Sequence, residues 1–370
     1  MLQAKPIEIH SALRTVLRIK AGLSPLGRIS DLTIDLPRQL AFLKRVYADA
    51  ARSGGPALVI GPYGSGKTHF LQLAKEYALK QGFAFAQLSQ DTGLASLAHP
   101  QRHLSTLIKS LSASSPYGNL LDWLGNAIEI PEYLNAFSVL LRQIRDEQPE
   151  QTEIIDVLLA ALTLPKEYRT TALVAFLSGS LLTGKTAHPS TRAEAYRLLR
   201  FWLCLCQKMF HCRGLILLID ELENLYTNAV CWNILSRRAA YRTLSFYATG
   251  LFPSVMLCTL TPDGHTRLMS EMNYERNFLV NSASHLMVEN IEAFIDAIIK
   301  TPPYELSPLK PREYAVLGAR LTALHAEARG YTGSQRFTFP QVSPGMTPRI
   351  FSKSVISILE SRWFETARSQ

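Results

Sequence analysis

Apolar and polar positions alternate along the chain in blocks that predict strands joined by helices. Residues 56–60 (PALVI) and 83–88 (FAFAQL) are short apolar runs of the length expected for buried strands. Residues 215–219 are apolar throughout, which is typical of a strand covered on both faces of a parallel sheet. A fourth apolar run, 253–260, ends in polar residues. The pattern predicts an α/β fold with a central parallel sheet.

Helical periodicity dominates the rest of the chain. After the first strand, residues 68–82 (THFLQLAKEYALKQG) place apolar side chains at helical spacing, and Gly82 is suited to end that helix. YLNAFSVLLRQIRDEQ and TEIIDVLLAALTL are also helical in pattern, and they predict a large helical insertion at about 95–190. TRAEAYRLLRFWLCLCQKMF is expected to return to the core, because it leads directly into the third strand.

The first strand and its helix are joined by a loop with the spacing of a phosphate-binding loop, Gly61-x-x-x-x-Gly66-Lys67-Thr68. In such a loop, free N–H groups at the helix start bind phosphate oxygens. Lys67 is expected to reach the β- and γ-phosphates of ATP, and Thr68 to hold Mg²⁺. The residues predicted to contact the nucleotide are Gly61, Pro62, Tyr63, Gly64, Ser65, Gly66, Lys67, Thr68 and His69.

A second segment, GSLLTGKT (179–186), has the same spacing. A chance match is expected on the order of once in a hundred chains of this length, so context must decide between the two. Pro189 follows closely and disfavours a helix that starts at Gly184. We therefore assign nucleotide binding to Lys67 and not to Lys185.

An acidic pair, Asp220-Glu221, ends the third strand. In parallel sheets ligands bind at the carboxyl ends of the strands. Asp220 is predicted to bind Mg²⁺, directly or through water, and Glu221 to polarise the attacking water as a general base. At the end of the fourth strand, Thr261, or Asp263 as second choice, is a candidate sensor of the γ-phosphate. A helix cap is an equally good interpretation of Thr261.

Composition bounds these interpretations. The chain has 370 residues, 47% of them hydrophobic, and a net charge of +9. That charge is compatible with nucleic-acid contact and equally with a solvated basic surface. No apolar run reaches the roughly 18–20 residues of a membrane span, and the N-terminus does not resemble a signal peptide. The cysteines favour a reducing cytoplasm over a disulfide framework, and they are Cys204, Cys206, Cys212, Cys231 and Cys258.

Two further clusters are weaker candidates for function. Cys204, Cys206, His211 and Cys212 resemble metal ligands, but a helix would point the first two in different directions. Packed free cysteines are the better interpretation. The basic cluster is suited either to DNA phosphates or to an interface or a solvated surface. It consists of Arg237, Arg238 and Arg242, flanked by Trp232, Tyr241 and Phe246.

The order of elements resembles that of AAA+ ATPases. More specifically, the chain resembles the ATP-binding proteins of BREX-type phage-defence islands, formerly a P-loop domain of unknown function. Four segments carry the resemblance, and they are IHSALRTVLRIKAGLSP, GPYGSGKTHFLQLAKEYALKQGFAFAQLSQD, LILLIDELENLYTN and MTPRIFSKSVISILE.

The resemblance implies an AAA+-like P-loop NTPase with a small C-terminal helical lid. Thr347-Pro348-Arg349 opens a helix there, with Thr347 as cap and Pro348 at the first position. By position, Arg349 matches the lid arginine that contacts the γ-phosphate. An arginine donated by a neighbouring subunit would be Arg276, or alternatively Arg267.

Three parts are therefore predicted: an N-terminal segment 1–45, an ATPase core 46–300 containing the insertion, and a lid 301–370. By resemblance, the protein is expected to bind ATP and Mg²⁺, to hydrolyse ATP and to assemble as a homo-oligomer. Its expected partners are defence proteins, including a helicase and a methyltransferase, and DNA through its backbone. The alternatives are a nucleotide-gated scaffold with little turnover and a transposition-type DNA-loading regulator.

Overall fold

The structure is a computed structural model, and it divides into two compact units. Unit 1 comprises Met1–Lys44, Val59–Tyr77 and Tyr304–Gln370, and unit 2 comprises Arg45–Leu58 and Ala78–Pro303. The phosphate loop thus falls in unit 1 and the acidic strand end in unit 2. The residues described are 6–25, 27–50, 54–89, 97–179, 192–226, 233–249, 254–281, 288–331, 339–343 and 345–368.

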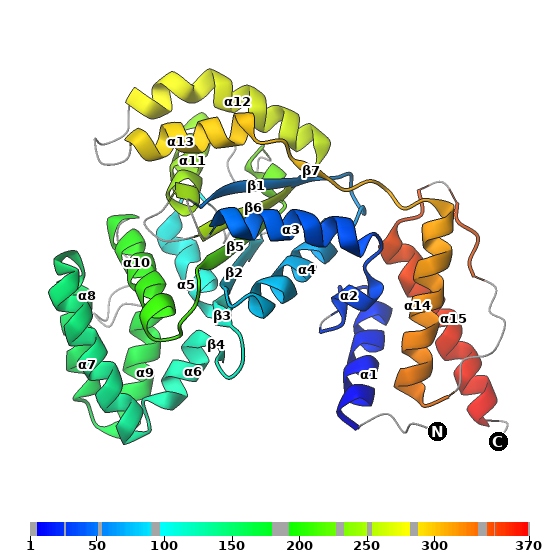
Figure 1. Ribbon diagram of the computed structural model, residues 1–370, viewed down its shortest axis with the longest axis horizontal. Coiled ribbons are helices and arrows are strands. Elements are labelled where there is room, and N and C mark those ends of the chain that lie inside the picture. Colours follow the sequence, from blue (N-terminus) through cyan, green and yellow to red (C-terminus); the bar gives the residue numbers. More distant parts are fainter. Residues whose placement is uncertain are drawn as a thin grey trace. The chain divides into compact units, whose positions relative to one another are not determined.

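Within the described residues, seven strands form one sheet in the order β4-β3-β2-β5-β6-β1-β7 (Figure 1). The strands are β1 (Gly55–Ile60), β2 (Ala84–Ser89), β3 (Ser112–Ala113), β4 (Gly118–Asn119), β5 (Leu215–Asp220), β6 (Ser254–Leu260) and β7 (Tyr304–Glu305). β5 pairs in parallel with both β2 and β6, and β7 pairs in parallel with the end of β1. The predicted α/β fold with a parallel core is confirmed.

Burial explains which strands the sequence revealed. All positions of β5 and β6 are buried, as expected when helices cover both faces of a parallel sheet. β3 and β4 form a short antiparallel pair at the edge beyond β2. Each has only two residues, too few to show a period, and the sequence did not reveal them.

Helices fill most of unit 2. They are α5 (Pro100–Ser110), α6 (Leu120–Ala127), α7 (Pro131–Glu147), α8 (Thr152–Leu162), α9 (Lys166–Leu177), α10 (Arg192–Lys208), α11 (Ile234–Thr249), α12 (Pro262–Asn281) and α13 (Val288–Lys300), with the 3₁₀ turns η2 (Pro149–Gln151) and η3 (Leu222–Tyr226). The segments predicted to be helical are α7, α8 and α10. Fully buried Trp202 of α10 donates its indole N–H to the Leu177 carbonyl at 2.8 Å, which ties α10 to the end of α9.

In unit 1 the two ends of the chain share one apolar core. The helices that begin in this unit are α1 (Pro6–Lys20), α2 (Ile29–Leu32), α3 (Leu36–Ala50), α4 (Lys67–Lys80), α14 (Pro311–Arg329) and α15 (Pro348–Arg368). α1 packs against both α14 and α15 (Figure 1). Val16 of α1, Leu321 of α14 and Phe351 of α15 are fully buried in the same cluster. The segment predicted to be a helical lid therefore contributes α14 and α15 to a three-helix layer whose third helix is α1.

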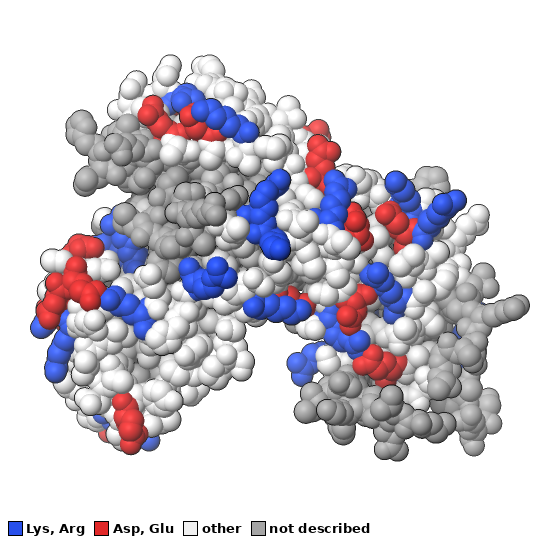
Figure 2. All heavy atoms as spheres, viewed as in Figure 1, with Lys and Arg blue, Asp and Glu red and all other residues white. Residues whose placement is uncertain are grey.

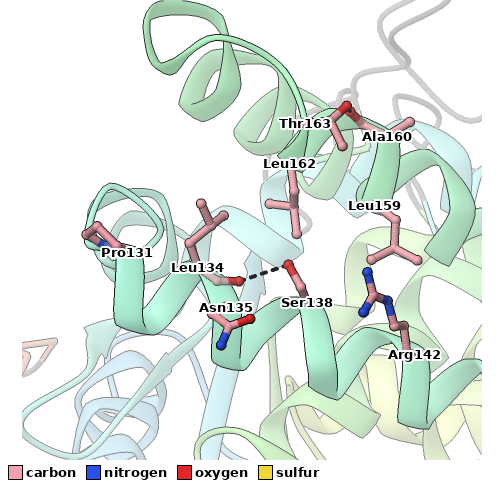
Figure 3. Close-up of a pocket in the computed structure, with 9 residues that line it drawn as sticks. All are labelled: Pro131, Leu134, Asn135, Ser138, Arg142, Leu159, Ala160, Leu162 and Thr163. Carbon is pink, nitrogen blue, oxygen red and sulfur yellow. Dashed lines mark hydrogen bonds between the residues drawn. The ribbon is translucent and has the colours of Figure 1, made fainter.

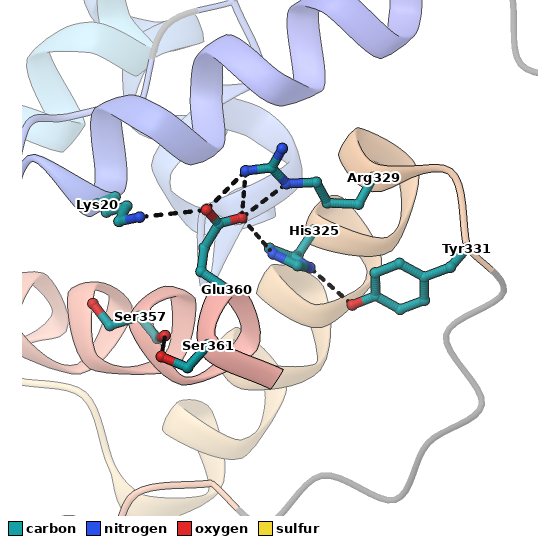
Figure 4. Close-up of polar contacts among 7 residues, drawn as sticks. All are labelled: Lys20, His325, Arg329, Tyr331, Ser357, Glu360 and Ser361. Atoms are coloured by element: carbon teal, nitrogen blue, oxygen red, sulfur yellow. Dashed lines mark hydrogen bonds and ion pairs between the residues drawn. The ribbon is translucent and has the colours of Figure 1, made fainter. Parts of the chain in front are cut away.

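A buried carboxylate holds this layer together (Figure 4). Glu360 of α15 accepts hydrogen bonds from Arg329 at 2.7 and 2.9 Å and from His325 Nε2 at 2.9 Å, and it pairs with Lys20 of α1 at 3.4 Å. Burial lowers the pKa of His325, so the ring is neutral near pH 7. Its Nε2–H then donates to Glu360, and Nδ1 accepts the Tyr331 hydroxyl at 2.8 Å.

Replacing this carboxylate should loosen the lid. We expect Glu360→Gln to lower the free energy of unfolding of α14 and α15 by about 2–3 kcal/mol, less than for a fully buried pair because Arg329 is partly exposed. Hydrogen exchange of peptides from the two helices measures the change. The exposed Glu365→Gln on the same helix is the control and should change little. Equal exchange in the two variants would contradict the assigned role of Glu360.

The same network should make the stability of the lid depend on pH. Arg329 and His325 hold the pKa of Glu360 below its usual value despite burial, and the pKa of His325 is also lowered. The unfolded chain therefore binds more protons than the folded chain in acid. Stability should be full at pH 7, decline as pH falls below 6.5, the ordinary pKa of histidine, and decline again below 4.5, that of glutamate. The second decline should be missing in Glu360→Gln.

Candidate functional site

The phosphate loop leaves β1 and turns through two glycines in the left-handed region. Gly64 has φ 77° and Gly66 has φ 97°, a conformation that side chains other than glycine adopt at a cost. Gly61 is needed for a different reason, since a Cβ there would collide with Ser65 Oγ. α4 begins directly after the loop at Lys67. Strand, glycine-rich loop and helix start thus form the expected phosphate cradle.

Lys67 is folded back onto its own loop. Its Nζ donates to the Gly61 carbonyl at 2.9 Å and to the Pro62 carbonyl at 3.4 Å, and the side chain is buried. The ammonium also lies 5.0 Å from the centre of the Tyr63 ring, which is itself 75% exposed. A buried ammonium held by carbonyl oxygens is placed to exchange them for phosphate oxygens.

A second feature of the loop, besides its backbone conformation and Lys67, is suited to a triphosphate. The Ser65 hydroxyl oxygen is buried and has no hydrogen-bond partner among the described residues. A buried hydroxyl without a partner is unfavourable, and a phosphate oxygen would satisfy it. The neighbouring Thr68 is exposed in the first turn of α4, and its hydroxyl is the group that this motif uses to bind a metal held by the phosphates.

His69, one of the residues predicted to contact the nucleotide, bonds to the N-terminal segment. Its Nε2 lies 2.9 Å from Thr33 Oγ1, and that hydroxyl donates to the Ile29 carbonyl at 2.8 Å. The imidazole must therefore be the donor. Burial lowers the pKa of His69 to about 4, so the ring is neutral and this bond persists at physiological pH. His69 thus connects the helix that follows the phosphate loop to residues near α2.

The start of α15 also touches the phosphate loop. A Cβ on Gly64 would collide with Thr347 Cγ2, so the two residues are in close contact. Thr347 caps α15, as predicted: its Oγ1 accepts the Ile350 N–H at 3.3 Å, and Pro348 is the first helical residue. The side chain of the next residue, Arg349, lies beside Gly22, where an added Cβ would be 3.6 Å from the guanidinium.

In unit 2, the predicted acidic pair is joined by hydrogen bonds. Asp220 is buried at the end of β5, and its Oδ1 accepts the Thr259 hydroxyl at 2.5 Å and the Glu221 N–H at 3.1 Å. Glu221 follows with φ 57°, an unusual conformation for a residue with a Cβ. The Glu221 N–H also lies 3.2 Å from Thr259 Oγ1. Strain of this kind persists where the surroundings enforce it, and it occurs often at functional sites.

Two contacts of the acidic pair were missed from the sequence. Thr259 of β6 is two positions before the residue chosen as the polar end of that strand. Asn224 of η3 donates from Nδ2 to Glu221 Oε2 at 3.2 Å. The spacing Asp220-Glu221-x-x-Asn224 was visible, but only the 3₁₀ turn brings the amide back onto the carboxylate.

Thr261 serves as a helix cap, the alternative that the sequence left open. Its Oγ1 accepts the Gly264 N–H at 3.1 Å at the start of α12. Asp263 lies in the first turn of that helix. The two arginines proposed to reach a neighbouring subunit both lie on α12, and both are ion-paired. Arg276 pairs with Asp296 of α13 at 2.8 Å, and Arg267 pairs with Glu271 of α12 at 3.8 Å.

The remaining candidate residues are buried in the core, form ion pairs between helices, or lie outside the described residues. Cys204, Cys206 and Cys212 are free and buried, and no group of three or more potential metal ligands occurs in the described part of the chain. Gly184, Lys185 and Thr186 of the second loop are outside it. In the basic cluster, Arg237 pairs with Glu271 at 2.9 Å and Arg238 with Glu275 at 2.5 Å. These bonds join α11 to α12.

A groove of about 500 Å³ lies elsewhere in unit 2, between α7 and α8 (Figure 3). Leu134, Leu159 and Leu162 line it, together with Arg142. Arg142 is the one cationic residue in its lining, whereas a triphosphate is typically bound by a loop and helix N-terminus that supply backbone N–H groups. The groove is therefore not the candidate nucleotide site.

Fold and phosphate loop together define a P-loop NTPase-like protein. Residues 10–126 match the model of a family described as BREX system ATP-binding protein BrxC/D. The matched segment contains the phosphate loop, and over it the resemblance inferred from the sequence is confirmed. The match supports an ATP-binding protein.

Other comparisons add little. No curated protein matches the chain. Among solved structures, the Walker-type ATPase PABY2304 of Pyrococcus abyssi is similar at a TM-score of 0.32 and 10% identity, over 86% of this chain and 61% of that one. The chain thus spans less than two thirds of that ATPase. In the described part of the chain, none of the helices has both the length and the apolarity to cross a membrane.

The contact between Gly64 and Thr347 makes a prediction about nucleotide binding. We expect Gly64→Ala to weaken ATP binding by about tenfold or more. The alanine would have to adopt a positive φ, and its Cβ would collide with the Thr347 side chain, so the loop would have to change shape. Titration with a fluorescent ATP analogue measures the affinity.

The matched control is Gly27→Ala. Gly27 also has a positive φ, 79°, but an added Cβ there meets nothing within 4 Å. This variant should bind within about twofold of the unchanged protein, since about 0.4 kcal/mol separates such affinities. Unchanged affinity in Gly64→Ala would show that the loop does not need this conformation.

Proposed function

We propose that this chain is an AAA+-like ATPase of a bacterial anti-phage defence system, with the nucleotide bound at Gly61–Thr68. The phosphate loop carries the proposal. It combines two left-handed glycines, a buried lysine bonded to loop carbonyls and a buried serine hydroxyl that lacks a partner among the described residues. The match to BREX-type ATP-binding proteins supports ATP as the ligand.

In this proposal the acidic pair acts on the nucleotide held by the phosphate loop. The position of the pair supports it, because ligands bind at the carboxyl ends of the strands in parallel sheets and Asp220 is the last residue of β5. Thr68 and Asp220 would hold Mg²⁺, a cation that typically takes one or two carboxylates and completes its shell with phosphates and water. The metal would neutralise charge on the β- and γ-phosphates.

Glu221 would activate the attacking water. A carboxylate can accept the water's proton only if it is held within hydrogen-bond reach. The bond from Asn224 to one carboxylate oxygen of Glu221 would help to orient that group. Lys67 would exchange its carbonyl partners for phosphate oxygens, and Arg349 would approach the γ-phosphate from the lid.

The N-terminal segment would couple the nucleotide to the lid. Residues 28–33 bond to the phosphate-loop helix through His69 and through Glu76, which accepts the Ile29 N–H at 3.3 Å. The same residues bond to α14, where Arg320 donates to the Thr33 carbonyl at 2.6 Å. A shift of α4 on nucleotide binding would therefore reach α14 through the bonds of Thr33.

The finer biological role follows from the resemblance. Bound ATP would favour homo-oligomers, and these would act in the cytoplasm on partner proteins, such as a helicase and a methyltransferase, or on DNA. Lysines and arginines on the face drawn in Figure 2 lie scattered, many of them beside acidic groups. This distribution, with the ion pairs of Arg237 and Arg238, supports contact with the DNA backbone less well than contact with protein.

A nucleotide-gated switch with little turnover is the second candidate. The ion pairs of Arg276 and Arg267 favour it, because an arginine held within its own chain is less available to a neighbour's phosphate. A transposition-type DNA-loading regulator would use the same core chemistry.

Two substitutions separate binding from hydrolysis. Lys67→Ala should abolish ATP binding, whereas Lys185→Ala should leave it intact. Glu221→Gln should keep ATP binding and lower steady-state hydrolysis by about 10²-fold or more, as expected for loss of a general base. Phosphate release, measured with and without duplex DNA, gives the rates.

A hydrolysis rate unchanged by Glu221→Gln would contradict the proposal that the protein is an ATPase and would favour the nucleotide-gated switch.

Mass photometry with ATP, ADP and no nucleotide tests assembly. Larger species should form only with ATP, and an invariant monomer would count against assembly.

Thr33→Val tests the proposed coupling. It removes the hydroxyl that accepts from His69 and leaves the bond between Ile29 and Glu76, so ATP should protect α14 and α15 from hydrogen exchange clearly less, while ATP affinity changes less than about threefold. Thr15→Val removes a similarly buried hydroxyl, bonded to the Ser11 carbonyl at 3.0 Å, and should retain the protection. ATP-dependent protection that is undiminished in Thr33→Val would contradict coupling through this bond.

A further inference from the structure

One buried hydroxyl joins both members of the acidic pair. Thr259 lies on β6 with no exposed surface. Its Oγ1 donates to Asp220 Oδ1 and accepts the N–H of Glu221 at 3.2 Å. A hydroxyl has one proton and two lone pairs, so this single group makes both bonds at once. It therefore links the predicted metal ligand to the backbone of the predicted general base.

The bond to Asp220 fixes the orientation of the carboxylate. Oδ1 accepts the Thr259 hydroxyl at 2.5 Å and the Glu221 N–H at 3.1 Å. Two donors from different strand ends restrain the rotation of the carboxylate about its last bond. Partners of this kind set the direction in which a ligating carboxylate offers its oxygens, and losing one typically costs about 10–100-fold in metal affinity or activity.

The bond from Glu221 supports a strained backbone. A φ of 57° is unfavourable for a residue with a Cβ and persists only where surrounding contacts enforce it. The Glu221 N–H is held by Thr259 and by Asp220, and the Glu221 carboxylate by Asn224. Without the Thr259 hydroxyl, one of the two restraints on this N–H is lost.

Packing of β6 alone does not require a hydroxyl here. Its neighbours along the strand, Leu257, Cys258 and Leu260, are buried and apolar, and the bonds described for the Thr259 hydroxyl are those to the Asp220 carboxylate and the Glu221 N–H. Valine has nearly the same shape and suits a buried strand at least as well. A hydroxyl in such a place is unfavourable unless it is bonded, so its partners, the two acids, account for it.

We propose that Thr259 is the positioning residue of the metal site: it orients Asp220 toward the nucleotide-bound Mg²⁺ and holds Glu221 in its left-handed conformation. The inference rests on the proposed function. Thr259 acts through the two acidic residues and does not itself contact the substrate. Thr261, which caps α12, has no such part.

The test compares Thr259→Val with Thr259→Ser. Mn²⁺ serves as the probe, and its binding is followed by electron paramagnetic resonance in the presence of a non-hydrolysable ATP analogue. Thr259→Val should weaken Mn²⁺ binding by about 10–100-fold, whereas Thr259→Ser, which keeps the hydroxyl, should stay within about threefold. Binding of the analogue in EDTA should be the same in all three proteins, because the phosphate loop is untouched.

Thr243→Val is the matched control for loss of a buried hydroxyl in the same unit. Thr243 has no exposed surface, and its hydroxyl donates to the Ala239 carbonyl of α11 at 3.2 Å. This variant should bind Mn²⁺ normally even if it is less stable. Equal Mn²⁺ affinity in Thr259→Val and the unchanged protein would overturn the inference while leaving the proposed function standing. An unchanged protein that binds no nucleotide and no Mn²⁺ would overturn both.

Discussion

The structure depends on one local constraint, the turn by which β1 becomes α4. Two glycines in the left-handed region let the backbone reverse within a few residues, so that α4 begins directly after the loop, and the N-terminus of a helix favours phosphate. Lys67 is then buried against carbonyls of its own loop, and the Ser65 hydroxyl is left without a partner among the described residues. Both groups are unfavourable to bury in this way unless an anion completes the site.

Unit 1 places both ends of the chain around this loop. The start of α15 lies on Gly64 through Thr347, while residues near α2 bond to α4 through His69. α1, α14 and α15 share one core, held by the buried Glu360 network. α14 and α15 are thus joined to α4 within a single compact unit, and in the proposed function these bonds would carry a nucleotide-dependent movement.

Much of the fold was predictable because the signals are local. Buried parallel strands are continuous apolar runs, and β1, β2, β5 and β6 were found on that basis. The phosphate loop and the Thr347 cap were recognised because each depends on adjacent residues. The short edge strands β3 and β4 were missed, since two residues show no period.

The contacts that orient the candidate site were not predictable. Thr259 is 38 residues from Glu221 in sequence and reaches it only because β6 lies beside β5. The sequence favoured the polar residue at the strand end, Thr261, yet its hydroxyl caps α12. Nothing in the sequence distinguishes the two threonines. Similarly, the sequence presents Arg237 and Arg238 as candidates for binding DNA phosphates, whereas in the structure they form ion pairs with Glu271 and Glu275 of α12.

The central claim is that the phosphate loop and the acidic pair close on one metal–nucleotide complex. A crystal structure with a non-hydrolysable ATP analogue and Mg²⁺ tests it most directly. The account predicts one ion at the β- and γ-phosphates, with the Thr68 hydroxyl as a ligand and the Asp220 carboxylate bound directly or through one water. An analogue bound away from Gly61–Thr68, or an ion without Asp220 in either shell, would contradict it.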